Sequence, residues 1–321
     1  MCRICQEAAP LETLSVPEMW FGTGEVFPYQ LCHGCGSLQI AEIPADLQRY
    51  YPPEYFSAWR RQPGIGLRVR EALATIRNWT VLFGPAPLYT ALLSIPVLGR
   101  RARINPLSPL RSKLRSRKMS IADVGGGTGQ LLRVLHRLGF RDLTCVDPYL
   151  PNDVQSPEFT LLRLPLTDVS RSFDVIMYNH TLEHVPDVGH ELRALYNHLN
   201  PGGLALVRLP LLPNDAFDTY RTHWVQIDPP RHLHIPSRPA LHGAAERAGL
   251  GVLSGGDDSW GFQFWGSELA ARRIPHHRDD TGRVLRQNFT VRQLGEFERR
   301  AARLNREGRG DQGWLLLRKA S

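Results

Sequence analysis

Short apolar runs alternate with amphipathic stretches along the last two thirds of the chain. Five of the runs have the length and composition of buried strands: residues 120–125, 142–147, 159–164, 173–179 and 202–210. Between them, leucines recur at helical spacing over 130–140, and residues 190–200 have a helical pattern too. Strands that alternate with helices are typical of a parallel sheet with helices on both faces. The pattern predicts the α/β fold class, with a doubly wound, mostly parallel sheet.

An uncharged stretch precedes these strands. Residues 78–99 hold twenty-two positions without a charge, which is long enough to span a bilayer. Three prolines would interrupt a helix there: Pro85, Pro87 and Pro96. Residues 100–118 then carry eight Arg or Lys and no acid, which equals the net charge of +8 of the whole chain. We expect an apolar and basic helical linker over 60–118, which is either a solvated connector or docks on a membrane surface through 78–118.

Four of the five cysteines form two C-x-x-C pairs, "CRIC" and "CHGC", separated by twenty-six residues. They are Cys2, Cys5, Cys32 and Cys35. Two residues between thiolates let one turn present both sulfurs to one ion, and two such turns complete a tetrahedral zinc site. Disulfides are disfavoured in a reducing cytosol, and a redox C-x-x-C lacks the preceding βαβ pattern. We predict a zinc-binding module over 1–59, with a structural zinc because four thiolates leave no open position.

The first residues contain no basic segment that leads into an apolar stretch, so no secretory signal is expected. Hydrophobic residues make up 42% of the chain and charged residues 22%, as in an ordinary globular protein. The fifth cysteine, Cys145, lies in an apolar run and is interpreted as a small core residue. We therefore expect a cytoplasmic protein, peripheral at the inner membrane face if the linker docks there.

The stretch "IADVGGGTGQLL", residues 121–132, places four glycines within five positions directly after the first strand. A loop at the carboxyl end of a strand, leading into a helix, is where an open α/β sheet binds its ligand. Three glycines would let the backbone pass close to that ligand: Gly125, Gly127 and Gly129. Asp147 ends the second strand, where it can accept hydrogen bonds from two ribose hydroxyls. These features predict a site for a nucleoside-bearing cofactor.

The spacing of the glycines narrows the choice of cofactor. A dinucleotide loop reads G-x-G-x-x-G, whereas "DVGGGTG" spaces its glycines two apart and places Asp123 just before them. A carboxylate there suits an ammonium group and repels a pyrophosphate. S-adenosylmethionine has an amino-acid end and no phosphate, so the acid and the spacing favour it.

With these motifs, residues 120–210 resemble class I S-adenosylmethionine-dependent methyltransferases of the small-molecule or glycan-pathway type. "IADVGGGTG" is similar to the first motif of that family, "CVD" to its ribose acid, "FDVIMYNHTLEHVPD" to the fourth strand with its "LEHV" box, and "LNPGGLALV" to the turn and fifth strand. The resemblance implies a Rossmann-like domain over 119–321, with a seven-stranded sheet that 311–319 completes. It also implies that Asp147 holds the ribose, while the adenine contact near Arg163 and Leu164 stays unassigned. The residues around the methionine end would be Asp123, Gly125, Gly127 and Gly129, and Asn179 is a further candidate cofactor-binding residue.

The box "HTLEH" also fits H-x-x-E-H, a zinc-protease pattern. A metalloprotease would need this box on one helix, whereas here it directly follows a strand within the methyltransferase motifs. His180, Glu183 and His184 would instead lie at the cofactor's edge. Some related O-methyltransferases bind a divalent metal through a more acidic version of this box, and His180 replaces an acid here. Whether a second metal binds beside Glu183 and His184 is left open.

Beyond the fifth strand, residues 219–253 resemble the segment that closes the acceptor site in many small-molecule methyltransferases. Its "HLH" places His232 and His234 near the centre. A histidine can accept a hydroxyl proton near neutral pH, so His232 and His180 are the candidate catalytic residues. Alternatively, the histidines and Arg231 only tie this loop to the sheet.

The cysteine pairs ahead of the domain are similar to those of zinc-bearing sugar methyltransferases. We therefore expect a small-molecule or glycan acceptor. The alternatives are an RNA methyltransferase, or a non-catalytic nucleic-acid-binding module on a degenerate methyltransferase fold, to which the basic run would contribute. Nucleic acid is the less favoured partner, because "YNHT" after the fourth strand lacks the N/D-P-P-aromatic box that grips an exocyclic amine. Whether O, N or C is methylated, and the oligomeric state, are left open.

Overall fold

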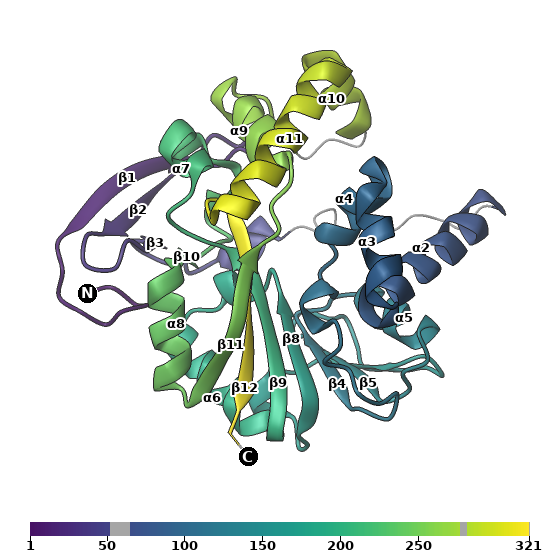
Figure 1. Cartoon of the computed structure of the whole chain (residues 1–321). Helices are drawn as coiled ribbons and strands as arrows, with labels where there is room; N and C mark the ends of the chain where they lie inside the picture. Colours follow the sequence, from purple (N-terminus) through teal and green to yellow (C-terminus); the bar gives the residue numbers. More distant parts are fainter. Residues whose placement is uncertain (52–64, 277–280, 321) are drawn as a thin grey trace.

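An eight-stranded sheet forms the centre of the molecule (Figure 1). The computed structural model describes residues 1–51, 65–276 and 281–320. The strand order is β11-β12-β9-β8-β4-β5-β7-β6. The five central strands pair in parallel. These are β4 (Ile121–Val124), β5 (Leu143–Val146), β7 (Thr160–Leu162), β8 (Phe173–Asn179) and β9 (Leu199–Pro210).

The edges of this sheet carry the antiparallel pairs. At one end, β12 (Gln312–Lys319) runs antiparallel to both β9 and β11 (Leu250–Asp257). At the other end, β6 (Val154–Gln155) runs antiparallel to β7. The five predicted central strands and the predicted strand over 311–319 are all present. With β11 and β6 the sheet has eight strands, one more than predicted, and β6 is the additional one. Its two residues are exposed, so no hydrophobic pattern marked it.

Helices cover both faces of the sheet, which confirms the doubly wound architecture. On one face, α6 (Val188–His198) and α8 (Arg238–Arg247) bury Leu195 and Leu241 against strand residues such as Val207. On the other face, α5 (Gln130–Arg137) and the end of α2 (Ile65–Phe83) bury Leu135 and Leu82. The alternation of side chains along β4 explains this division, because Ala122 and Val124 face the first layer and Ile121 faces the second.

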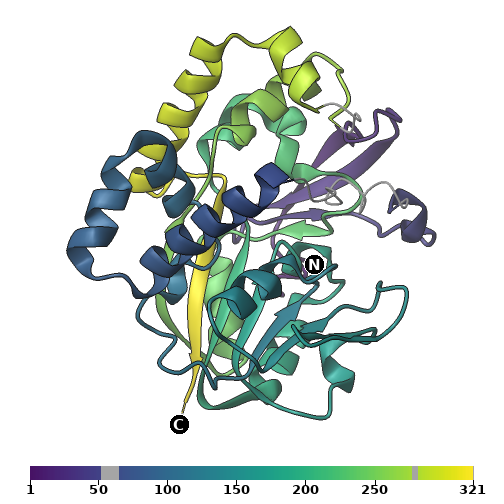
Figure 2. The ribbon, with the colours of Figure 1, turned by 90° about the vertical axis from the view of Figure 1, so that its right-hand side faces the viewer.

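The predicted linker contains three consecutive helices, α2, α3 (Ala86–Ser94) and α4 (Pro96–Arg103), seen together in Figures 1 and 2. Pro85 precedes the first residue of α3, and Pro96 begins α4. No helix in the described ranges is both long and apolar enough to cross a membrane. Two of the basic residues are structural. Arg111 donates to the carbonyls of Thr80, Val81 and Gly84 at the end of α2, and the Arg117 guanidinium lies 3.6 Å from the centre of the Phe83 ring.

The N-terminal residues form a second, antiparallel sheet of four strands. Three come from the N terminus: β1 (Leu11–Pro17), β2 (Val26–Cys32) and β3 (Leu38–Ile40). The fourth, β10 (His234–Ile235), comes from the segment between β9 and β11. The N-terminal module is therefore completed by a strand from the predicted methyltransferase domain. The expected boundary at residue 59 lies outside the described residues.

A further helical layer covers the end of the molecule beyond the carboxyl ends of β9 and β11 (Figure 1). It consists of α7 (Asp215–Tyr220), α9 (Phe262–Ala271), α10 (Thr281–Asn288) and α11 (Val291–Glu307). Phe264 of α9 and Leu304 of α11 are buried together. A capping box formed by Thr290 and Gln293 fixes the start of α11, and Gly308 in the left-handed region ends it.

Candidate functional site

The glycine loop lies between β4 and α5, at the carboxyl edge of the sheet. Gly125, Gly127 and Gly129 all have positive φ values, of 69°, 53° and 71°. A Cβ atom at Gly125 would collide with the side chain of Thr181, whereas one at Gly127 would meet nothing within 4 Å. Gly125 therefore allows close packing against the segment after β8, and Gly127 borders open space where a ligand can lie.

A buried carboxylate and a half-buried amide side chain lie under this loop. Asp123 is 3% exposed, and the Asn179 amide nitrogen lies 3.5 Å from its Oδ1 atom. The Oδ1 atom of Asn179 is buried and has no hydrogen-bond partner among the described residues. Burial raises the pKa of Asp123 to about 7, and the nearby Asp147 contributes to that increase. The pair thus offers acceptor atoms for a cationic ligand, which would favour the ionised carboxylate.

Asp147 follows β5 and faces the same loop. Its Oδ2 atom accepts from the Gly127 amide at 3.1 Å, and its Oδ1 atom accepts from the Tyr149 amide at 2.9 Å. Burial raises the pKa of Asp147 too. Two carboxylates around an open glycine loop are unfavourable for a phosphate, and they suit an amine together with ribose hydroxyls. The predicted cofactor residues therefore meet at one place, and their chemistry fits S-adenosylmethionine.

A cluster of histidines around one buried carboxylate lies directly after β8. Glu183 is fully buried, and its Oε1 atom lies 3.1 Å from His180 Nδ1 and 3.9 Å from His232 Nε2. The rings of His184 and His232 are 4.8 Å apart. His180 has a φ of 53°, in the left-handed region that residues other than glycine seldom adopt. Such strained backbone positions cluster at functional sites. The structure thus brings the predicted His180 and His232 to the same carboxylate oxygen of Glu183.

The ring of His184 is held in one orientation. Its Nδ1 atom lies 2.8 Å from the carbonyl oxygen of Arg231 and 3.1 Å from the Tyr51 hydroxyl. Burial lowers the pKa of His184 to about 4, so the ring is neutral near pH 7. His234 is buried too, and its Nε2 atom donates to the Leu182 carbonyl at 2.8 Å.

The loop that carries His232 is anchored to the N-terminal sheet. The side chain of Arg231 is fully buried and pairs with Glu18 at 2.7 Å and with Asp228 at 2.6 Å. The Tyr29 hydroxyl donates to the carbonyl of His232 at 2.7 Å. Sequence reasoning missed Glu18 and Tyr29, because each lies more than two hundred positions from its partner and such pairs carry no local signal of their contact. It also missed Asp228, which is only three positions from Arg231. These ion pairs of Arg231 hold the loop against the N-terminal sheet, and the choice between a catalytic and a purely structural role for the histidines stays a prediction.

The four N-terminal cysteines also converge. The Sγ atoms of Cys2 and Cys35 are 3.7 Å apart, those of Cys5 and Cys32 are 3.9 Å apart, and all four lie within 4.8 Å of one another. Tetrahedral zinc with Zn–S bonds of about 2.3 Å requires sulfurs about 3.8 Å apart. All five cysteines are free of disulfides, and Cys145 is buried in the core as predicted.

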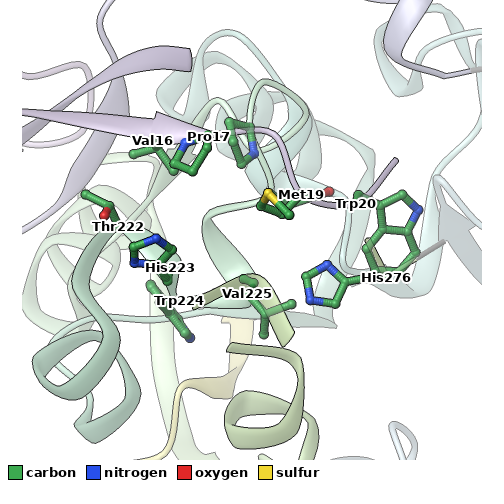
Figure 3. Close-up of a pocket in the computed structure, with 12 residues that line it drawn as sticks. Val16, Pro17, Met19, Trp20, Thr222, His223, Trp224, Val225 and His276 are labelled. Carbon is green, nitrogen blue, oxygen red and sulfur yellow. The ribbon is translucent and has the colours of Figure 1, made fainter. Parts of the chain in front are cut away.

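A small cavity of about 20 Å³ lies between the N-terminal sheet and the loop after α7 (Figure 3). Pro17, Met19 and Trp20 line one side, and Trp224 and His276 lie across from them. The cavity is far too small for a nucleoside, and it is not lined by residues of the glycine loop. It is therefore a packing gap beside the anchored loop and not the cofactor site.

Comparison with known proteins agrees with this arrangement. Residues 100–254 match the family described as a methyltransferase domain. The chain carries a class I methyltransferase domain. This domain is that of an S-adenosylmethionine-dependent transferase, and its sheet has the Rossmann-like fold. No curated protein matches the sequence significantly.

Several solved structures are similar to this chain at low sequence identity and with TM-scores below 0.5. A Galdieria sulphuraria protein proposed to be a sarcosine dimethylglycine methyltransferase is 16% identical, over 77% of this chain and 98% of its own, with a TM-score of 0.46. The 1,6-didemethyltoxoflavin-N1-methyltransferase of Burkholderia thailandensis, solved with its substrate and S-adenosylhomocysteine, is 15% identical, over 82% and 93%, with a TM-score of 0.40. The cyclopropane synthase MmaA2 of Mycobacterium tuberculosis is 14% identical, over 70% and 84%, with a TM-score of 0.42. These likenesses do not define an acceptor for this methyltransferase.

Proposed function

We propose that this methyltransferase transfers the methyl group of S-adenosylmethionine to a hydroxyl group of a small-molecule or sugar/glycan acceptor. The observation that carries the proposal is the histidine cluster around Glu183, next to Asn179 of the predicted cofactor site. The cofactor supplies an activated methyl group when bound. The chain must then align the acceptor and remove its proton.

The proposed cofactor residues divide the ligand between them. Asp123 and the free Oδ1 atom of Asn179 would hold the ammonium group, and Asp147 would hold the ribose hydroxyls. Gly125, Gly127 and Gly129 would let the loop approach the ligand, which the open space beside Gly127 supports. These assignments predict that Asp147→Asn weakens binding of S-adenosylhomocysteine in calorimetry, while the same change at the exposed Asp168 does not.

His180 and His232 are the proposed proton acceptors. His180 is the more accessible, with 34% of its side chain exposed against 7% for His232. The Nδ1 atom of His232 donates to the Gln226 carbonyl at 2.6 Å, so only its Nε2 atom is available. Alanine in place of whichever of His180 and His232 accepts the proton should lower kcat and leave the affinity for S-adenosylhomocysteine unchanged.

The acceptor class is tested by transfer of labelled methyl groups to nucleotide sugars, lipid-linked glycans, small hydroxylated molecules and RNA. Label in a small molecule or glycan supports the proposal. Label in RNA alone contradicts it, and would be accompanied by binding that weakens steeply with salt.

We also propose that the four N-terminal cysteines bind one structural zinc ion, which the spacing of their sulfur atoms supports. Docking on a membrane surface through 78–118 stays a prediction. Trp79 of α2, Leu88 of α3 and Leu98 of α4 are exposed apolar side chains, as is Ile95 between α3 and α4. Sedimentation with anionic vesicles tests it, and binding equal to that on neutral vesicles would contradict the role of the basic residues.

A further inference from the structure

We propose that Glu183, His184 and His232 form a binding site for a divalent transition-metal ion, separate from the cysteine cluster. Their ligand atoms all lie within 4.8 Å of one another. Among the residues that the structure describes, only this group and the four cysteines bring three or more such atoms so close together. Glu183 and His232 are buried, so the site is built into the protein and is not a chance grouping on the surface.

His184 and His232 each leave the Nε2 atom available to bind a metal ion. The Nδ1 atom of His184 lies 2.8 Å from the Arg231 carbonyl, and that of His232 lies 2.6 Å from the Gln226 carbonyl. A carbonyl oxygen only accepts, so each Nδ1 atom carries the hydrogen and each Nε2 atom keeps its lone pair. A hydrogen bond from the second nitrogen to a backbone carbonyl is the usual outer contact of a metal-binding histidine.

The carboxylate supplies an independent observation. The Oε2 atom of Glu183 is buried without a hydrogen-bond partner in the described part of the chain, although Oε1 faces His180. Leaving a buried carboxylate oxygen unpaired is costly, and a cation between Glu183 and the two Nε2 atoms would satisfy it. Nearby, the buried Arg231 is already paired with Glu18 and Asp228, so its guanidinium is engaged elsewhere.

The ligand types define the class of ion. Two imidazole nitrogens and one carboxylate oxygen suit Zn²⁺, Mn²⁺, Co²⁺ or Fe²⁺, whereas Mg²⁺ and Ca²⁺ prefer sites made of oxygen atoms alone. Three protein ligands also leave positions open for an exogenous oxygen. Catalytic zinc sites have this character, unlike the closed cysteine site.

The role of the ion rests on the proposed function. In methyl transfer to a hydroxyl, the O–C bond forms, the S–C bond of the donor breaks and the hydroxyl proton must leave. A divalent cation beside the acceptor oxygen lowers the pKa of that hydroxyl. This arrangement assigns His232 to the ion and leaves the more exposed His180 to take the proton.

The ion site is tested with Mn²⁺. Thiolates bind this ion poorly, so the cysteine cluster should not add to the number of bound ions. Electron paramagnetic resonance of the full chain should count one bound Mn²⁺ per molecule. Glu183→Gln and His184→Asn should each weaken this binding at least ~10-fold. His242→Asn, on α8 and outside the cluster, is the matched control and should bind as the wild type does.

Calorimetry with S-adenosylhomocysteine and circular dichroism identify variants that fail to fold. Glu183→Gln conserves shape, so it remains informative if His184→Asn does not fold. Wild-type affinity for Mn²⁺ in a folded Glu183→Gln or His184→Asn protein would overturn the proposal, as would no binding to the wild type. If Mn²⁺ binds but no hydroxylated acceptor is methylated, the site stands and the proposed acceptor is wrong.

Discussion

Asp123 places a buried carboxylate in the proposed cofactor site, at a cost to the stability of the ligand-free protein. Burial raises its pKa from the ordinary value of 3.8 to about 7, so the folded state binds the proton more tightly than the unfolded state. Stability that is fully present below pH 4 is therefore lost as the pH rises towards 7. A bound ammonium group reverses this effect, because it favours the ionised form.

Asp123→Asn should therefore stabilise the ligand-free protein at pH 8 and weaken ligand binding. A shift of about 3 pKa units corresponds to a gain on the order of 2–4 kcal/mol in the free energy of unfolding, absent at pH 4. Urea denaturation at the two pH values measures the gain, and calorimetry should show at least tenfold weaker binding of S-adenosylhomocysteine. Asp168→Asn, at an exposed position, is the control. A gain that is equal at both pH values would contradict this account.

Gly125 and Gly127 have different expected roles in one loop: Gly125 allows close packing, and Gly127 faces the proposed ligand. Both have positive φ, so alanine costs about 1–2 kcal/mol of stability at either position. Gly125→Ala should cost more, because its Cβ atom would also collide with Thr181. Gly127→Ala faces open space, so it should cost only the backbone amount while still weakening binding of S-adenosylhomocysteine. Denaturation and calorimetry on the two variants check this, and equal losses of stability would exclude the collision as a cause.

At the scale of elements, the sequence predicted the strands that are buried on both faces. β4, β5 and β8 are mostly apolar and mostly buried because helices cover both sides of them, and such runs can be recognised locally. β10 could not be predicted in this way. Its two residues pair with β3, which lies about two hundred residues earlier in the chain, and nothing in "HI" indicates that partner.

The same reasoning explains which parts of the candidate site were predictable. The glycine loop and Asp147 follow strands that the pattern identified, so their convergence was expected from parallel topology alone. His232 reaches Glu183 only because β10 joins the N-terminal sheet and Arg231 is paired with Glu18. These are tertiary contacts, and the periodicity of the sequence does not encode them.

The anchor between the two sheets should control the loop that carries His232. Glu18→Gln removes the charge that faces the buried Arg231, so we expect a loss of roughly 1–3 kcal/mol in stability and faster hydrogen exchange over 228–235. Glu12→Gln breaks the exposed pair with Arg221 at 3.2 Å and should cost under about 1 kcal/mol. Equal protection of 228–235 in the two variants would show that the buried pair does not hold the loop.

At the scale of the whole molecule, the cysteine module is part of the main core. Cys2, Ile4 and Cys32 pack in the same buried cluster as Leu192 of α6 and Leu241 of α8. The module also shares its sheet with β10. A disturbance at the cysteines should therefore reach β10 and the loop that carries His232, although the cysteines themselves lie outside the glycine loop.

Loss of the proposed zinc should accordingly unfold more than the N-terminal residues. Cys5→Ser should remove one zinc ion per chain, lower Tm, and increase hydrogen exchange at β10 more than at β4. The unequal effect is expected because β10 hydrogen-bonds to the module, whereas β4 lies between β5 and β8 in the central sheet. Cys145→Ser is the control, since Cys145 is buried but is not one of the four clustered cysteines, and it should keep the zinc. If Cys5→Ser loses the metal while Tm and hydrogen exchange at β10 match the wild type, the module is an independent unit. The proposed coupling between the cysteines and the loop that carries His232 would then be wrong.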